Sequence, residues 1–242
     1  MPVDPWILAL AMAITVVAAI IQGTVGFGLG VISVPLLSLL DRDLAPVPQL
    51  LIVLVMAMLM VWRERTDLDL SGVGWVMAGR LPGAVLGLAL IKAFADSKGL
   101  DGLIAVLVIM AVLTLASGVT IPITRTTQVV AGIVSATTSL VASIGGPPIA
   151  LLYRTATGAK LRSTLNAIFV LGITLTILVR ALASEISGDD LQVAGFLLPS
   201  ALLGLWISRS LTGKIEGQRL RTAVLLVSGL AAVGLLGRAL FS

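Results

Sequence analysis

The sequence predicts an all-α, polytopic membrane protein, and its composition and hydrophobic patterning both support this fold class. Of the 242 residues, 58% are hydrophobic and only 12% are charged, whereas a soluble domain carries roughly 25% charged residues. The hydrophobic residues form about eight long segments, and most of these approach the ~20 residues that cross a ~30 Å hydrocarbon core. Because backbone groups in lipid need hydrogen-bond partners within their own segment, we expect these segments to be helices.

The charged residues indicate a membrane topology and argue against several classes of function. The net charge is +4, but lysine and arginine lie in short loops, as topology signals do, so nucleic-acid binding is not expected. The chain contains no cysteine and no histidine, which removes disulfides and the commonest metal ligand and general base. Residues 1–5 lack the basic region of a signal peptide, so we expect the first segment to be retained.

The sequence also predicts an internal duplication with a spacing of ~117 residues. The N-terminal repeat would cover residues 1–118 and the C-terminal repeat residues 119–242. Residues 81–88 (LPGAVLGL) and 198–205 (LPSALLGL) are identical at six of eight positions. The same spacing aligns Gly28 with Gly145, Arg63 with Arg180 and Lys92 with Arg209. A chance match between apolar sequences is the alternative, but internal repeats are common in secondary transporters.

One segment in each predicted repeat is interrupted by glycine or proline. Residues 7–40 contain GTVGFGLG at 23–30, and residues 126–153 contain SIGGPP at 143–148. A straight helix of about 30 residues would be ~45 Å long, and glycine and proline favour a break. Non-helical backbone at membrane depth persists only where protein buries it or water reaches it. Matched interruptions in two halves therefore indicate a transport site.

The interrupted segments leave two topologies open. If each crosses the membrane, each half has four spans and the repeats are parallel; if each is a re-entrant hairpin, each half has three spans and the repeats are inverted. The loop charges do not choose between these models. Both place the loops around Lys160 and 209–221 in the cytoplasm of a bacterium and both termini outside its inner membrane.

The arginines are the main candidates for binding chemistry. No aspartate or glutamate lies near the centre of a segment, whereas Arg80 lies inside one, Arg154 follows the second break and Arg162 opens the next segment. An arginine at depth costs ~3 kcal/mol or more unless it is paired or hydrated. An anionic ligand would supply the partner, since guanidinium matches its oxygens. Anchoring by the positive-inside rule, or snorkelling in the case of Arg80, is the alternative.

The broken helices provide a second means of binding an anion. A helix N-terminus exposes unpaired N–H groups and a partial positive charge of ~0.5, and hydroxyl and amide side chains lie nearby, although hydrogen bonding between helices would also explain them. The predicted substrate-binding residues are Gln22, Thr24, Gly26, Gly28, Gly30, Ser33, Arg80, Ser139, Ser143, Gly145, Gly146, Pro147, Pro148, Tyr153, Arg154, Arg162 and Asn166. By contrast, Gly79, Gly83 and Gly87 repeat every four residues and predict close helix packing.

At these motifs the chain resembles the TauE/SafE family of sulfite or sulfonate permeases. The resemblance rests on Gly26-Phe-Gly28 with Pro35, on GGPPIALLYR at 145–154, and on GAKLRSTLN at 158–166. Many members carry a Gly-Gly run in the first half, where this chain has Gly26-Phe-Gly-Leu-Gly30. The resemblance implies transport of sulfur-containing anions such as sulfite or sulfoacetate.

We therefore expect a secondary transporter or facilitator that exports a small organosulfur anion across the inner membrane. An anion channel and a non-transporting assembly subunit are the alternatives. An intramembrane enzyme is disfavoured, because no nucleophile–base pair is visible at depth. No cofactor, metal or nucleic acid is expected, the lipid bilayer is the surrounding partner, and a homodimer is left open.

Overall fold

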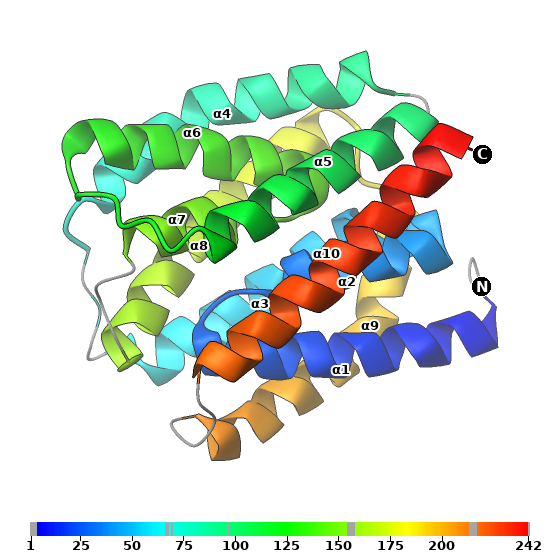
Figure 1. Ribbon diagram of the computed structural model, residues 1–242, viewed down its shortest axis with the longest axis horizontal. Coiled ribbons are helices and arrows are strands. Elements are labelled where there is room, and N and C mark those ends of the chain that lie inside the picture. Colours follow the sequence, from blue (N-terminus) through cyan, green and yellow to red (C-terminus); the bar gives the residue numbers. More distant parts are fainter. Residues whose placement is uncertain are drawn as a thin grey trace.

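The computed structural model describes residues 4–65, 68, 70–95, 97–153, 158–212 and 217–241, and these form an all-helical bundle (Figure 1). Six helices in this part of the chain are long and apolar enough to cross a membrane. The predicted all-α membrane class is confirmed at this level, while the count of eight segments stays a prediction. The elements are α1 (Pro5–Val25), α2 (Leu29–Leu40), η1 (Arg42–Leu44), α3 (Val47–Arg63), α4 (Val73–Ala93), α5 (Ser97–Ala116), α6 (Arg125–Ala142), α7 (Gly146–Leu152), α8 (Gly158–Leu182), α9 (Gly188–Leu211) and α10 (Gly217–Phe241).

The first interrupted segment consists of α1 and α2. Helix α1 starts with Pro5 in its first turn, and the Asp4 carboxylate accepts a hydrogen bond from the Trp6 amide, an arrangement typical of helix N-termini. Gly26, the residue directly after α1, has φ +101°, and Gly28 has φ +124°. Both conformations are in the region that favours glycine. The sequence pattern therefore encodes the break between α1 and α2 directly.

The second interrupted segment consists of α6 and α7. Thr124 and Thr127 form a reciprocal capping box at the start of α6. Ser143, the residue directly after α6, adopts a left-handed conformation with φ +56°. The chain becomes helical again at Gly146, with two prolines in the first turn of α7, where a missing N–H group is tolerated. Both predicted interruptions therefore occur where glycine and proline place them.

Helix packing brings the two halves of the chain together. Helix α4 packs against α6, α1 against α9, α3 against α8 and α5 against α10. A Cβ atom added at Gly79 or Gly83 would collide with a backbone carbonyl of α6, and one at Gly87 would lie 2.9 Å from the Leu140 Cβ. The predicted packing role of these three glycines is confirmed.

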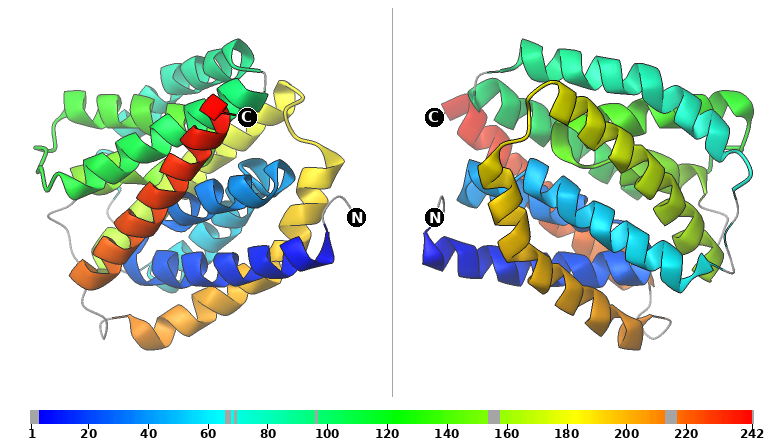
Figure 2. Two further views of the ribbon diagram at one scale, coloured as in Figure 1. Left: turned by 45° about the vertical axis from the view of Figure 1, so that its right-hand side comes forward. Right: turned by 180° about the vertical axis from the view of Figure 1, so that it is seen from behind.

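The helices of the two halves run in opposite directions. Figures 1 and 2 show α1 leading away from the edge that carries the N-terminus, whereas α6 leads toward that edge. Helices α5 and α10 likewise cross with opposite directions, and both ends of the described chain lie at the same edge of the bundle. This arrangement brings the breaks after α1 and α6 toward the middle of the bundle from opposite sides.

An ion cluster around the buried Asp101 carboxylate, near one end of α3, also joins the two halves. The Asp101 Oδ2 atom lies 2.6 Å from Arg42 Nη2 and 2.9 Å from Arg238 Nη2, and the Asp101 side chain is only 4% exposed. Arg42 precedes α3, Asp101 belongs to α5 and Arg238 to α10. This carboxylate is therefore committed to a structural contact away from the breaks.

Candidate functional site

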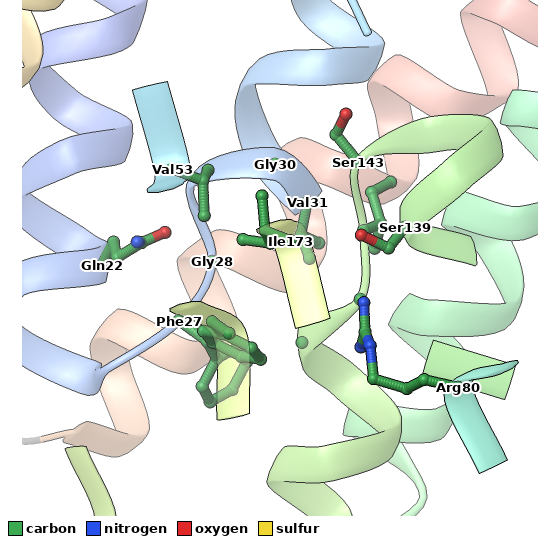
Figure 3. A pocket seen from close by; sticks show the side chains of 14 residues that line it. Gln22, Phe27, Gly28, Gly30, Val31, Val53, Arg80, Ser139, Ser143 and Ile173 are labelled. Atoms are coloured by element: carbon green, nitrogen blue, oxygen red, sulfur yellow. The ribbon is translucent and has the colours of Figure 1, made fainter. Parts of the chain in front are cut away.

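The two helix breaks face each other across a small internal cavity (Figure 3). A Cβ atom added at Gly30 would collide with the Ser143 carbonyl oxygen, and one at Gly146 would lie 3.2 Å from the Phe27 Cβ. The cavity has a volume of about 30 Å³, which is room for a few water molecules at most. It is lined by Gln22, Phe27, Gly28, Gly30, Val31, Val53, Arg80, Ser139, Ser143, Ile144, Gly145, Gly146, Phe169 and Ile173.

Among the described residues that line this cavity, Arg80 alone has a charged side chain. It is 1% exposed, and its Nη1 and Nη2 atoms donate to Ser135 Oγ at 2.7 Å and to Thr176 Oγ1 at 3.3 Å. Its Nε atom is buried without a hydrogen-bond partner among the described residues. No described carboxylate pairs with Arg80, although a buried charge is normally paired. Within the described part of the chain, the positive charge of Arg80 therefore has no compensating carboxylate.

Gln22 provides a second unpartnered donor on the opposite wall of the cavity, as Figure 3 shows. Its Oε1 atom accepts a hydrogen bond of 3.2 Å from the amide of Leu29, the first residue of α2. This bond orients the side-chain amide, and its Nε2 atom is buried without a partner in the described chain. Gly28 and Gly30 bring the first turn of α2 to the same cavity, where backbone amides of a helix N-terminus are available.

Helix α8 contacts Arg80 and positions its side chain. Phe169 and Ile173 line the cavity, Thr176 accepts a hydrogen bond from Arg80, and a Cβ atom added at Gly172 would collide with the guanidinium group. These residues are spaced by three or four positions and therefore share one helix face. Gly172 thus creates the space in which the guanidinium group lies.

We expect Gly172→Ala to displace the Arg80 guanidinium group and to weaken anion binding by about tenfold, as a loss of one charge-assisted hydrogen bond would. Half-saturating anion concentration in a transport assay measures the effect. Gly195→Ala is the matched control, because Gly195 also lies inside a helix and has no atoms within 4 Å of an added Cβ. Equal affinities of the two variants would contradict the placement of Arg80.

The structure brings eight of the predicted site residues to the cavity. These are Gln22, Gly28, Gly30, Arg80, Ser139, Ser143, Gly145 and Gly146. Gly26 lies in the first break but is not among the lining residues, and its carbonyl accepts a hydrogen bond from Asn166 Nδ2 at 3.1 Å. Asn166 therefore supports the turn that follows α1. The binding role of all these residues remains a prediction.

Several other candidates make contacts away from the cavity. The Arg162 Nη2 atom lies 2.9 Å from Glu64 Oε1, so Arg162 already has a carboxylate partner, which it shares with Arg63. The hydroxyl groups of Thr24 and Ser33 donate to backbone carbonyls in the preceding helical turn. Tyr153 OH donates to the Ser71 carbonyl at 3.5 Å.

The remaining candidates lie either in α7 or outside the described residues. Pro147 and Pro148 lie in the first turn of α7, and Pro148 lines an apolar surface pocket. Helix α7 has seven residues and prolines at its second and third positions, so it contributes few amides to an anion. Arg154 lies outside the described residues.

The sequence did not identify the residues that contact the Arg80 side chain. It also did not identify most of the apolar residues that line the cavity. Ser135 accepts from Arg80 and donates to the Gly145 carbonyl at 2.7 Å, which links the arginine to the second break. Ser135 belongs to the polar sequence SATTS at 135–139, and this polarity within an apolar segment was a usable signal. Thr176 and Gly172 carry no such signal, because their role depends on the packing of α8 against α4.

The comparisons with known proteins give one match. Neither the curated proteins nor the solved structures contain a match to this chain. A family model described as sulfite exporter TauE/SafE matches residues 11–235. This match spans both helix breaks, the Arg80 helix and α8. The chain therefore belongs to the TauE/SafE sulfite exporter family of membrane transporters.

Proposed function

We propose that the protein exports a small organosulfur anion, such as sulfite or a sulfonate, across the bacterial inner membrane, and that the central cavity binds it. Family membership supports transport of sulfite or a related anion in general. The observation that carries the proposal is the buried Arg80, which has no carboxylate partner among the described residues and lies beside two helix breaks. An arriving anion would supply the missing negative charge.

The chemistry of the cavity favours an oxyanion. Arg80 Nε and Gln22 Nε2 are both N–H donors without partners in the described structure, and they lie on opposite walls. Guanidinium groups and amides match the oxygen atoms of sulfite and sulfonates. Phe27, Phe169 and Ile173 provide apolar surface for a short carbon chain. The proposed ligand is therefore a small anion with several oxygens.

The membrane potential is the proposed driving force. The described residues that line the cavity include no aspartate or glutamate, and such groups normally form proton relays at membrane depth. An inside-negative potential drives a monovalent anion outward by ~2.3 kcal/mol per 100 mV. Export of the anion therefore needs no coupled ion in this proposal.

We further propose that the two halves are inverted repeats that rock about the cavity. The opposite directions of α1 and α6, and of α5 and α10, support this orientation (Figure 1). The contacts also correspond, because a spacing of 117 residues converts the packing of α4 on α6 into that of α9 on α1. Alternating movement of such repeats around a fixed site is common in secondary transporters. The small volume of the cavity favours such a carrier over an open channel.

Anion efflux from proteoliposomes tests this mechanism. Methanesulfonate is a suitable probe, because its single charge does not change near neutral pH. We expect its efflux to increase by up to tenfold for each ~60 mV of inside-negative potential and to ignore an imposed pH gradient. Efflux that follows the pH gradient but not the potential would reject the uncoupled mechanism, and absence of any protein-dependent efflux would reject anion transport. Single-channel currents would favour the channel alternative.

A further inference from the structure

Two arginines outside the cavity bind equivalent carbonyl groups at the ends of the broken helices. Arg180 on α8 donates from Nε to the Leu140 carbonyl at 2.9 Å, and its Nη2 atom donates to the same oxygen. Arg63, the last residue of α3, donates from Nη2 to the Gly23 carbonyl at 3.3 Å. The two arginines are 117 positions apart in the sequence, and so are the two carbonyl residues.

The bound carbonyls occupy the same position in both helices. Gly23 is two residues before Val25, the last residue of α1, and Leu140 is two residues before Ala142, the last residue of α6. The last carbonyls of a helix lack intrahelical partners and carry a partial negative charge of ~0.5. Each arginine therefore places a guanidinium group on the negative end of a broken helix.

A broken helix presents opposite partial charges at one place. At the first break the negative end of α1 adjoins the positive end of α2, so their effects on a bound ion oppose each other. The carbonyl end would repel an anion and attract a cation. A guanidinium group bound to the carbonyl end of α1 removes this repulsion. The partial positive charge at the amide end of α2 then attracts the anion.

We propose that Arg63 and Arg180 are positioning residues that give the cavity its preference for anions, by neutralising the C-terminal ends of α1 and α6. This inference rests on the proposed function, because it concerns the same cavity. Neither arginine lines the cavity, so both act through the helix ends and their charge.

Arg180 and Arg63 differ in burial and in how strongly they bind their helix-end carbonyls. Arg180 is 5% exposed and uses two nitrogen atoms on one carbonyl oxygen. The Arg63 side chain is 20% exposed, and its Nη2 atom also lies 2.9 Å from Glu64 Oε1. The adjacent carboxylate offsets part of the Arg63 charge. We therefore expect Arg180 to have the larger influence on a bound anion.

The test compares two anions of fixed and different charge in proteoliposomes. Arg180→Gln retains an N–H donor for the Leu140 carbonyl but removes the charge. We expect it to raise the half-saturating concentration about threefold for methanesulfonate and about tenfold for doubly charged sulfoacetate, within the range for helix-end charges. Arg180→Lys should restore both values, and Arg63→Gln should show the same charge dependence with smaller changes.

Each outcome supports or overturns the inference. Equal losses for the two anions in Arg180→Gln, or no loss at all, would overturn it, because a distorted site does not discriminate by ligand charge. If Arg180→Gln does not fold, the loss for sulfoacetate is compared with the loss for methanesulfonate in Arg63→Gln, and that comparison decides. Arg209→Gln is the control, since Arg209 is exposed near the end of α9. If replacement of Arg80 affects neither anion, the proposed function itself fails, which is a separate result.

Discussion

Arg80→Met is expected to abolish anion transport without lowering the thermal stability of the protein. The loss of one buried charge that pairs with the ligand weakens binding by about 2 kcal/mol or more, which is at least ~30-fold in affinity. The measurements are anion efflux from proteoliposomes and thermal unfolding of the purified protein in detergent. Together they separate a binding role from a structural role.

The stability part of this prediction follows from the environment of Arg80. The side chain is 1% exposed and has no described carboxylate partner, and burial of an unpaired charge is unfavourable. Its two hydroxyl partners have other acceptors, because Ser135 donates to Gly145 and Thr176 donates to Gly172. Methionine fills a similar volume with an apolar chain, so its substitution leaves few unsatisfied groups. Active sites commonly trade stability for function in this way.

Two further variants control this experiment. Arg80→Lys keeps the charge but not the planar group that reaches both Ser135 and Thr176, so partial activity is expected. Arg209→Gln removes an exposed arginine from α9 and should transport normally. Normal transport by Arg80→Met, or a large loss of its thermal stability, would contradict the assignment of Arg80 as the anion's counter-charge.

The predictable features of this protein depend on local sequence. Glycine and proline mark both helix breaks, since Gly26 and Gly28 adopt positive φ angles at the first break and two prolines lie in the first turn of α7 after the second. The hydropathy pattern alone placed Arg80 at depth. The contacts of Arg162 could not be predicted, because Glu64 is distant in the sequence and becomes its partner only through packing.

The orientation of the two halves was also beyond the reach of the sequence. Loop charges were compatible with parallel and with inverted repeats, whereas the directions of α1 and α6 in the folded chain support the inverted one. The matched contacts of Arg63 and Arg180 illustrate the same limit. Their spacing was visible in the sequence, but the carbonyls they bind become known only when α3 and α8 are packed against the breaks.

Gly30→Ala is expected to reduce anion affinity by about fivefold or more, because Gly30 packs directly against the second break. Gly30 is the second residue of α2, and an added Cβ atom would collide with the Ser143 carbonyl oxygen at the second break. Overpacking of this kind costs about 1–3 kcal/mol. When this cost applies to the anion-binding state, it lowers the affinity roughly five- to 150-fold. The half-saturating concentration for methanesulfonate efflux measures it.

The expected loss of anion affinity in Gly30→Ala can be distinguished from a change in helix stability. Alanine stabilises a helix interior by roughly 0.5–1 kcal/mol relative to glycine, so the local effect of Gly30→Ala opposes the expected loss. Gly74→Ala controls for that effect, because Gly74 lies in the first turn of α4 with no atoms within 4 Å of an added Cβ. Normal affinity in Gly30→Ala would mean that α2 and the Ser143 turn separate without consequence for the ligand. The cavity between the breaks could then not be the place where the anion binds.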